Sequence, residues 1–553
     1  MTARASVILL LSTTLLAACA TTGPAPMASA APVEAPSADP MPAPAAELAS
    51  ASAESAHDRL FQLFKDSDEA SLKLNPIGAI FRGDLRYADR LGDGITDAYY
   101  DEARALVRSD LERLRAIDRS QLNATDQLAY DVFEYSNKDG LEGLSPALLS
   151  LTAVRPLNHF FGFQTFYPTF ANGKGAAPFK TVLDYENNLK RHSNYAWWVD
   201  QAIIRFRQGA DSGVVETKMT VRNVIEQLDN QLKQKPEESQ LYGPAKQFPA
   251  DFAVADKARL TAAHRAAIAG EIFPALTRLR DYLKQDYVPK ARDGYGIMYM
   301  KGGEQLYRYL VKSTTTLDMT PDAIHNLGLS EVARIRGEME KVRTEVGFKG
   351  DLTKFFDHLR ADPKFKMKSR EALTQGYYDI GKAVDAKMPE YFSTIPKTKL
   401  EIRPYDKTIE KFQAGGSYEQ GTPDASRPGT FYFSAYDLPS RTTPGMTTLY
   451  LHEGSPGHHF QISLAQENEA LPPFMRFGGN TAYVEGWALY SETLGYDMGF
   501  YKDPYQRFGT LSDEMLRAMR LVVDTGIHSK GWTRQKSIDY MLANSGLDVL
   551  SIK

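Results

Sequence analysis

The sequence contains a single cysteine among its 553 residues, and this residue, Cys19, lies close to the N-terminus. One thiol cannot form an internal disulfide, so cross-links do not hold the fold together. Neither sign of charge dominates either, since the formal net charge is -4. A chain this close to neutral gives no reason to expect nucleic acid as a partner, because a polyanion-binding protein is typically basic.

The remaining composition is that of a globular protein. Charged residues make up 24% of the chain and aromatic residues 11%, so most of it is neither disordered nor embedded in a membrane. The length allows a large core and a division into two or more lobes around a cleft.

The N-terminus reads as an export signal. Arg4 precedes an apolar run at residues 7–18, which is too short to span a bilayer and is typical of a secretion signal. The run ends at residues 16–19 in Leu-Ala-Ala-Cys, which resembles the bacterial lipoprotein box. We therefore expect Cys19 to be lipidated and to anchor the protein in the cell envelope. The alternative is a small buried thiol within an ordinary signal.

The residue after the cysteine bears on which membrane holds the anchor. Residue 20 is alanine rather than the aspartate associated with retention in the inner membrane of enteric bacteria. We therefore expect the outer membrane, with the protein facing the periplasm. Residues 20–56 are dominated by alanine, proline and serine, a composition that predicts a disordered tether.

Beyond the tether, apolar residues recur at helical spacing, for example at Leu60, Leu63 and Phe64. This predicts an N-terminal helical lobe over residues 57–297 and a second, catalytic lobe over 298–553. A long helix is expected from Pro321 to about Val346, with Thr320 as its N-cap. Residues 430–434 read Thr-Phe-Tyr-Phe-Ser, the strongest strand signal in the chain. The predicted fold class is mainly α, with a small β-sheet beside the motif described next.

A cluster of possible metal ligands lies at residues 452–459, which read His-Glu-Gly-Ser-Pro-Gly-His-His. Zinc hydrolases use three protein ligands, leave one position for water, and place a carboxylate nearby to take the proton of that water. On an unbroken helix the two histidines would be four residues apart. Here Pro456 interrupts that spacing, so a bulge or wide turn is expected to bring His458 to the site together with His452. His459 is the reserve ligand, or else it donates a hydrogen bond to one of the metal ligands.

The third ligand is expected from another helix. Residues 481–492 carry Glu485 and Glu492 seven positions apart, hence on one face of a helix. Glu485 lies far enough beyond His459 for a helix, a turn and a returning helix, so it is predicted to bind the metal, with Glu492 supporting it.

A further helix carries Arg520, Asp524 and His528 at successive steps of four. Asp524 is expected to pair with Arg520 and to hold one tautomer of His528, which could donate to the oxyanion of a tetrahedral intermediate. Each motif also has a structural interpretation: the Pro-Gly-His-His turn as a polar helix start, the two glutamates as a solvated face, and the Arg-Asp-His series as a buried network.

With these residues in view, the chain resembles the bacterial family called domain of unknown function 885, which is grouped with the zincin peptidases. The resemblance runs from about Leu60 to the last residue. It is carried by residues 302–304, 324–328, 426–429, 451–461, 484–490 and 520–528. The distance from the histidine motif to Glu485 is also similar to that in thimet oligopeptidase-like enzymes, in which a glutamate in this setting binds zinc.

The resemblance implies a bilobal helical fold with a deep cleft, a zinc cofactor, and Glu453 as the general base. Members of the family continue past residues 544–546 into another helical stretch, whereas this chain ends at Lys553, so a C-terminal truncation is expected.

The predicted function is zinc-dependent hydrolysis of peptide bonds in short peptides. His452, His458 and Glu485 would hold the metal, and Glu453 would activate water. The candidates for contacts with the transition state or the substrate are His528, Tyr490, Arg427 and Tyr483. Two alternatives stay open: an envelope amide hydrolase acting on peptidoglycan peptides, and a catalytically silent lipoprotein that binds peptides.

Overall fold

The computed structural model describes residues 54–553 apart from 161, 408, 548 and 553. Cys19, the predicted signal and most of the predicted tether lie outside the described residues. The last part of that tether belongs to the first helix, because Ser55 caps the helix that begins at Ala56. Among the described residues, no helix is both long and apolar enough to cross a membrane.

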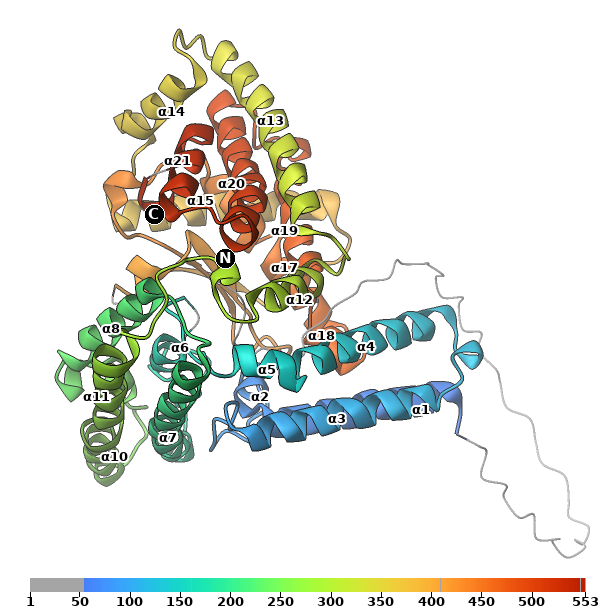
Figure 1. The fold of residues 1–553 in the computed structure, drawn as a ribbon, viewed down its shortest axis with the longest axis vertical. Coiled ribbons are helices and arrows are strands. Elements are labelled where there is room, and N and C mark those ends of the chain that lie inside the picture. Colours follow the sequence, from blue (N-terminus) through green and yellow to red (C-terminus); the bar gives the residue numbers. More distant parts are fainter. Residues whose placement is uncertain (1–53, 161, 408, 548, 553) are drawn as a thin grey trace, which may run out of the picture.

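The chain up to about residue 291 folds into two groups of helices, drawn from blue to turquoise and in green in Figure 1. The first group consists of α1 (Ala56–Leu74), α2 (Pro76–Phe81), α3 (Asp97–Arg115), α4 (Ala124–Gly143) and α5 (Pro146–Thr152). The second consists of α6 (Phe163–Phe170), α7 (Val182–Ser212), α8 (Lys218–Leu232), α9 (Gly243–Lys246), α10 (Val254–Ala267) and α11 (Phe273–Tyr282).

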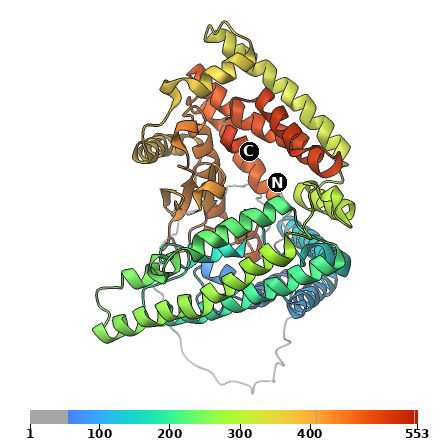
Figure 2. The same ribbon diagram turned by 60° about the vertical axis from the view of Figure 1, so that its left-hand side comes forward.

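The green helices form a bundle around α7, and Figure 2 shows several of them running side by side. α7 begins with a capping box in which Thr181 and Asp184 satisfy each other's backbone amides. Its buried face, including Tyr195 and Phe206, belongs to a hydrophobic core that extends from Ile77 to Ala291 along the sequence. Burial of this face stabilises a helix of such length.

The rest of the chain runs from yellow-green through yellow and orange to red in Figure 1. Its helices are α12 (Gly303–Thr315), α13 (Pro321–Glu345), α14 (Leu352–Ala361), α15 (Arg370–Tyr391), α16 (Met446–Glu453), α17 (His458–Glu467), α18 (Pro473–Arg476), α19 (Thr481–Asp497), α20 (Pro504–Ser529), α21 (Arg534–Asn544) and α22 (Val549–Ile552). Its strands are β1 (Leu400–Pro404), β2 (Gly416–Glu419) and β3 (Gly429–Phe433).

The predictions of a long helix and of a strand are confirmed. α13 spans Pro321–Glu345 and its N-cap is Thr320, whose hydroxyl accepts a hydrogen bond from the amide of Ala323 at 3.2 Å. α13 packs along α20, and a side chain at Gly328 would lie 2.7 Å from Cβ of Leu521, so only glycine allows this close approach of the two helices.

β3 is the central strand of a small sheet in the order β1-β3-β2, parallel to β1 and antiparallel to β2. Phe431 and Phe433 of β3 are fully buried and contact Tyr377 of α15. β2 contacts α16 and β3 contacts α17, so the expected sheet lies beside the histidine motif.

Packing between helices brings the motif residues together. α16 packs against α15, α19 and α20, while α17 packs against α19. The side chains of α18 extend to the first group of helices, where Phe474 lies 4.8 Å, between ring centroids, from Phe64. The histidine motif is therefore held between the small sheet on one side and α19 and α20 on the other.

Candidate metal centre

The helix that carries the histidine motif is interrupted, as predicted from Pro456. α16 ends at Glu453 and α17 begins at His458, with a turn between them. Gly457 makes the return of the chain possible: a Cβ at this position would lie 2.0 Å from the carbonyl oxygen of His452. No other residue fits such a gap, so this turn brings His458 back towards His452.

Two side chains of α19 hold the turn. The indole of Trp487 donates a hydrogen bond to the carbonyl oxygen of Pro456 at 2.7 Å, and the hydroxyl of Ser491 donates to the same oxygen at 3.2 Å. The turn and α19 are therefore fixed relative to each other. Sequence reasoning missed both residues, because neither is a type that signals a metal site.

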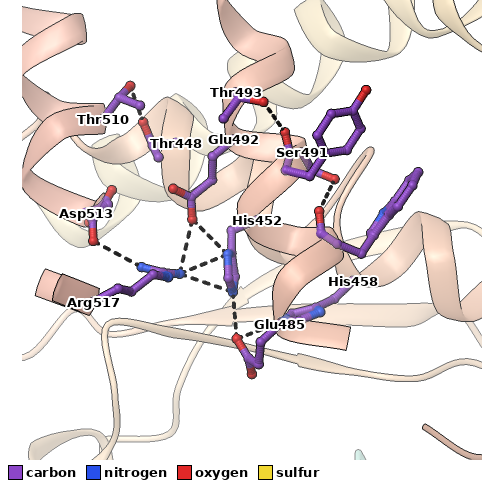
Figure 3. A network of polar contacts seen from close by, with 12 residues as sticks. Thr448, His452, His458, Glu485, Ser491, Glu492, Thr493, Thr510, Asp513 and Arg517 are labelled. Carbon is purple, nitrogen blue, oxygen red and sulfur yellow. Dashed lines mark hydrogen bonds and ion pairs between the residues drawn. The ribbon is translucent and has the colours of Figure 1, made fainter. Parts of the chain in front are cut away.

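His452, His458 and Glu485 converge on one point (Figure 3). Nε2 of His452 lies 3.4 Å from Oε2 of Glu485, and Nε2 of His458 lies 4.0 Å from the same oxygen. One ligand atom from each of the three residues can be chosen so that all lie within 4.8 Å of one another. Ligands about 2.1 Å from a tetrahedral zinc ion are about 3.4 Å apart, so small side-chain movements would complete such a site.

The other nitrogen of His452 is held by a second carboxylate of the same helix. Nδ1 lies 2.8 Å from Oε1 of Glu492, which is buried. Because a carboxylate only accepts, Nδ1 donates its proton to Glu492, and Nε2 is the nitrogen that faces Glu485. Glu492 therefore takes the supporting position predicted for it, in the arrangement by which carboxylates orient histidine ligands of metals.

Arg517 of α20 completes this network and was not predicted. Its guanidinium lies 3.1 Å from Oε1 of Glu492 and 2.9 Å from Nδ1 of His452. Arg517 and Nδ1 of His452 are both donors, so they do not bond to each other. They lie close together because both donate to Oε1 of Glu492. Asp513 of the same helix accepts from Arg517 through its backbone carbonyl. A pair of charges four residues apart on a helix is too common to have marked these two residues in the sequence.

Glutamate side chains give the centre an excess of negative charge, which affects the pKa values of its residues. Burial lowers the pKa of His452, but hydrogen bonds with Glu485 and Glu492 outweigh it and raise that pKa to about 9. Burial raises the pKa of Glu485, but the hydrogen bond with His452 outweighs it and lowers that pKa to about 2. Burial also lowers the pKa of His458 to about 4, so this imidazole is neutral and able to bind a cation.

Glu453 lies next to this group without taking part in its contacts. No hydrogen bond or ion pair between described residues uses its carboxyl group. Burial, followed by the opposing charge of His452 and the like charge of Glu485, gives it a pKa of about 7. A carboxyl group that changes protonation near neutral pH is suited to act as a general base or acid.

The donor set fits a divalent cation such as zinc. Two imidazole nitrogens and one carboxylate oxygen leave a fourth position open, as in catalytic zinc sites. Glu453 and Glu492 add negative charge around them. One feature departs from the usual pattern, since Nδ1 of His458 is buried without a hydrogen-bond partner among the described residues.

The predicted role of His459 as a reserve metal ligand is wrong for this geometry. Successive residues of a helix point about 100° apart. His458 points to the candidate metal centre, so His459 points away from it and towards the sheet. Its Nδ1 lies 3.1 Å from the hydroxyl of Tyr418 and 3.4 Å from that of Ser463. It belongs to the packing between α17 and β2.

The contacts of Arg520, Asp524 and His528 on α20 differ from those predicted. Asp524 accepts a hydrogen bond from the hydroxyl of Tyr307 at 2.6 Å. No hydrogen bond or ion pair between described residues involves the guanidinium of Arg520, so the expected pairing with Asp524 is not formed. Nδ1 of His528 accepts from the backbone amide of Ile297 at 3.0 Å, and its Nε2 lies 3.9 Å from Asp524.

The three other residues predicted to contact the substrate lie in different surroundings. The guanidinium of Arg427 donates to the carbonyl oxygens of Gln420 and Phe81 and so ties the sheet to α2, and its contact with a substrate stays a prediction. Tyr490 is 53% exposed on α19, with its ring 5.7 Å from that of Trp487. Tyr483 is half-buried, one turn before Trp487.

A family model described as "Bacterial protein of unknown function (DUF885)" matches residues 76–553. No curated protein matches the chain. A solved structure described as "the putative lipoprotein from Colwellia psychrerythraea" is 24% identical, with a TM-score of 0.81 over 90% of this chain and 88% of that one.

A second solved structure is described as "a putative lipoprotein of unknown function from Shewanella oneidensis". It is 16% identical, with a TM-score of 0.60 over 89% of this chain and 88% of that one. At these identities the two similarities show a shared fold, and they leave the chemistry of the site to be argued from its residues.

Replacing Gly457 with alanine is predicted to abolish cation binding while leaving most of the helical structure in place. The added Cβ would overlap the carbonyl oxygen of His452, and the turn would have to open and separate the two imidazoles. Gly486→Ala is the matched control, because a Cβ there meets nothing within 4 Å and the position adjoins Glu485. Zinc content and circular dichroism of both variants test this, and zinc retained in Gly457→Ala would contradict it.

Binding of a divalent cation is predicted to release about one proton at neutral pH. His452, with a pKa of about 9, carries a proton that must leave before Nε2 can bind. His458, with a pKa of about 4, has none to lose. Protons therefore compete with the cation below pH 9, and affinity should fall about tenfold for each unit of acidification. Zinc titrations between pH 6 and 8 measure this, and a constant affinity over that range would rule it out.

Proposed function

We propose that this chain, which belongs to the DUF885 family of bacterial proteins, is a zinc-dependent peptidase that hydrolyses peptide bonds in short peptides. One observation carries the proposal: His452, His458 and Glu485 converge on one point, and the uncommitted carboxyl group of Glu453 adjoins them. This is the residue set from which proteins build hydrolytic zinc sites.

The division of roles follows from the contacts. A zinc ion held by the three ligands supplies Lewis acidity, which lowers the pKa of water and polarises a carbonyl group. Glu453 takes the proton of the attacking water on its carboxylate and passes it to the departing amine. Its carboxyl group is suited to both transfers, because it is buried beside the ligands and no hydrogen bond or ion pair between described residues occupies it.

The supporting residues keep the ligands in place. Glu492 fixes the tautomer and the direction of His452, and Arg517 neutralises part of the charge of Glu492. Trp487 and Ser491 hold the turn that sets the distance between the two histidines. Tyr490 and Tyr483, on the same helix as Glu485, are the candidate substrate contacts. His528 receives no step, since its ring accepts from the backbone of Ile297.

The proposed location is the bacterial cell envelope, with the protein attached through a lipid on Cys19. The Leu-Ala-Ala-Cys sequence at residues 16–19 supports this, as do the descriptions of both solved relatives as putative lipoproteins. We further propose the outer membrane, facing the periplasm, because alanine follows the cysteine. There the substrates would be short peptides present in the periplasm.

Two substitutions separate the metal ligand from the base. Glu453→Gln should retain one zinc per chain but lower kcat about a hundredfold to ten-thousandfold, because the amide cannot accept the proton. Glu485→Ala should lose both zinc and activity, because only two ligands remain. Zinc content and hydrolysis of a short-peptide library, measured on the same preparations, provide the test, with Gly486→Ala as a control that should resemble the wild type.

The possible outcomes distinguish the proposal from its rivals. Cleavage of muropeptides in place of linear peptides would assign an envelope amide hydrolase. Wild-type protein that holds zinc but hydrolyses neither substrate class would favour a binding protein. Purified protein that takes up no zinc at all would contradict the proposed function directly.

A further inference from the structure

Arg520 is a charged side chain that the proposed chemistry does not use. It lies on α20, three residues after Arg517, so along the helix it is about 4.5 Å beyond the residue that contacts His452. Among the described residues, its guanidinium makes no hydrogen bond and no ion pair. Other arginines of the same region are committed: Arg517 pairs with Glu492, and Arg507 pairs with Glu345.

Arg520 combines exposure to solvent with charged neighbours. Its side chain is exposed. Even so, the surrounding protein lowers its pKa, the neighbouring charge of Arg517 lowers it further, and the charges of Glu485 and Asp524 oppose this. Along α20, Arg520 lies between Arg517, which contacts His452, and Asp524, which contacts Tyr307 of α12.

This position matters because the centre is rich in carboxyl groups. Glu453, Glu485 and Glu492 surround the two histidines, and they would repel a substrate carboxylate that approaches the scissile bond. An uncommitted guanidinium with five donors in a planar fork is the side chain best suited to bind a carboxylate. Arg520 supplies that fork three residues beyond Arg517, whose guanidinium contacts His452 and Glu492.

We propose that Arg520 binds a carboxylate of the substrate and thereby selects peptides that carry a carboxylate close to the scissile bond. The inference rests on the proposed function and names its substrate class. The carboxylate has two possible sources. The C-terminus of the peptide would make the protein an exopeptidase that acts near that end, and an aspartate or glutamate side chain would make it selective for acidic peptides.

The experiment uses the full chain with zinc and one set of short peptides. The first pair is Ala-Ala-Phe-Ala-Ala as the free acid and as the C-terminal amide. The other pairs are C-terminal amides of the same peptide in which one position at a time is replaced by glutamate or by glutamine. Wild type, Arg520→Gln, Arg520→Lys and the control Arg507→Gln are compared by kcat/KM. Binding of the same peptides is measured by calorimetry in the Glu453→Gln background, which gives a readout that does not depend on turnover.

We expect wild-type protein to prefer a carboxylate peptide over its neutral partner by about 10- to 100-fold, the contribution of a hydrogen-bonded charge pair. Preference for the free acid over the amide identifies the C-terminus, and preference for glutamate over glutamine identifies a side chain. Arg520→Gln should lose the preference by weakening only the carboxylate peptides, Arg520→Lys should keep part of it, and Arg507→Gln should keep all of it. Zinc content should be the same in all four proteins.

The inference is overturned if Arg520→Gln keeps the wild-type preference or weakens acid and neutral peptides equally. It is also overturned if wild type shows no preference. Failure of the proposed function has a different signature, namely no hydrolysis of any peptide by the wild type. In that case calorimetry still decides whether this residue binds carboxylates, by comparing the Glu453→Gln protein with the same protein that also carries Arg520→Gln.

Discussion

The imidazole of His452 lies between two carboxylates of one helix, and the geometry of the centre depends on this contact. Glu485 and Glu492 stand two helical turns apart on α19, and the ring of His452 bridges the space between them, with Nε2 towards the first and Nδ1 towards the second. One rigid helix thus supplies a candidate ligand and the group that orients another. α19 also fixes the turn through Trp487 and Ser491, so it sets the position of His458 as well.

The same arrangement concentrates negative charge in a small volume, and the remaining features of the centre respond to it. Three glutamates lie around two histidines, which raises the pKa of His452 and, with burial, that of Glu453. A cation between the ligands would offset this charge. Arg517 offsets part of it from behind, while Arg520 remains available to a ligand. Metal binding and substrate choice are therefore linked in such a centre. The negative charge that attracts a cation would repel an anionic substrate unless an arginine lies nearby.

Much of the site could be predicted from residue types and spacing. The interruption at Pro456, the convergence of His452 and His458, and the positions of Glu485 and Glu492 on one face follow from where proline breaks a helix and where a helix places side chains seven residues apart. The mainly helical fold, the helix capped by Thr320 and the strand around Phe431 follow from periodicity and capping. These features are local, or repeat at a fixed interval, and a single sequence displays them.

What could not be predicted depends on contacts between distant segments. Arg427 looked like a substrate contact in the sequence, yet it bonds to the backbone of Phe81, which lies far away along the chain. Asp524 binds Tyr307 of α12 and so leaves Arg520 uncommitted. The direction of His459 depends on the place of β2, where Tyr418 receives it. Each outcome is set by the packing of a second element whose position no local pattern specifies.

The central claim is that His452, His458 and Glu485 hold one ion between them. Crystals of the full chain grown with zinc, and an anomalous difference map calculated at the zinc absorption edge, test it most directly. The account predicts a single strong peak about 2.1 Å from Nε2 of both histidines and from a carboxylate oxygen of Glu485, with Glu453 close by and His459 still against Tyr418. A peak bound elsewhere, or none at these residues in zinc-containing crystals, would contradict it.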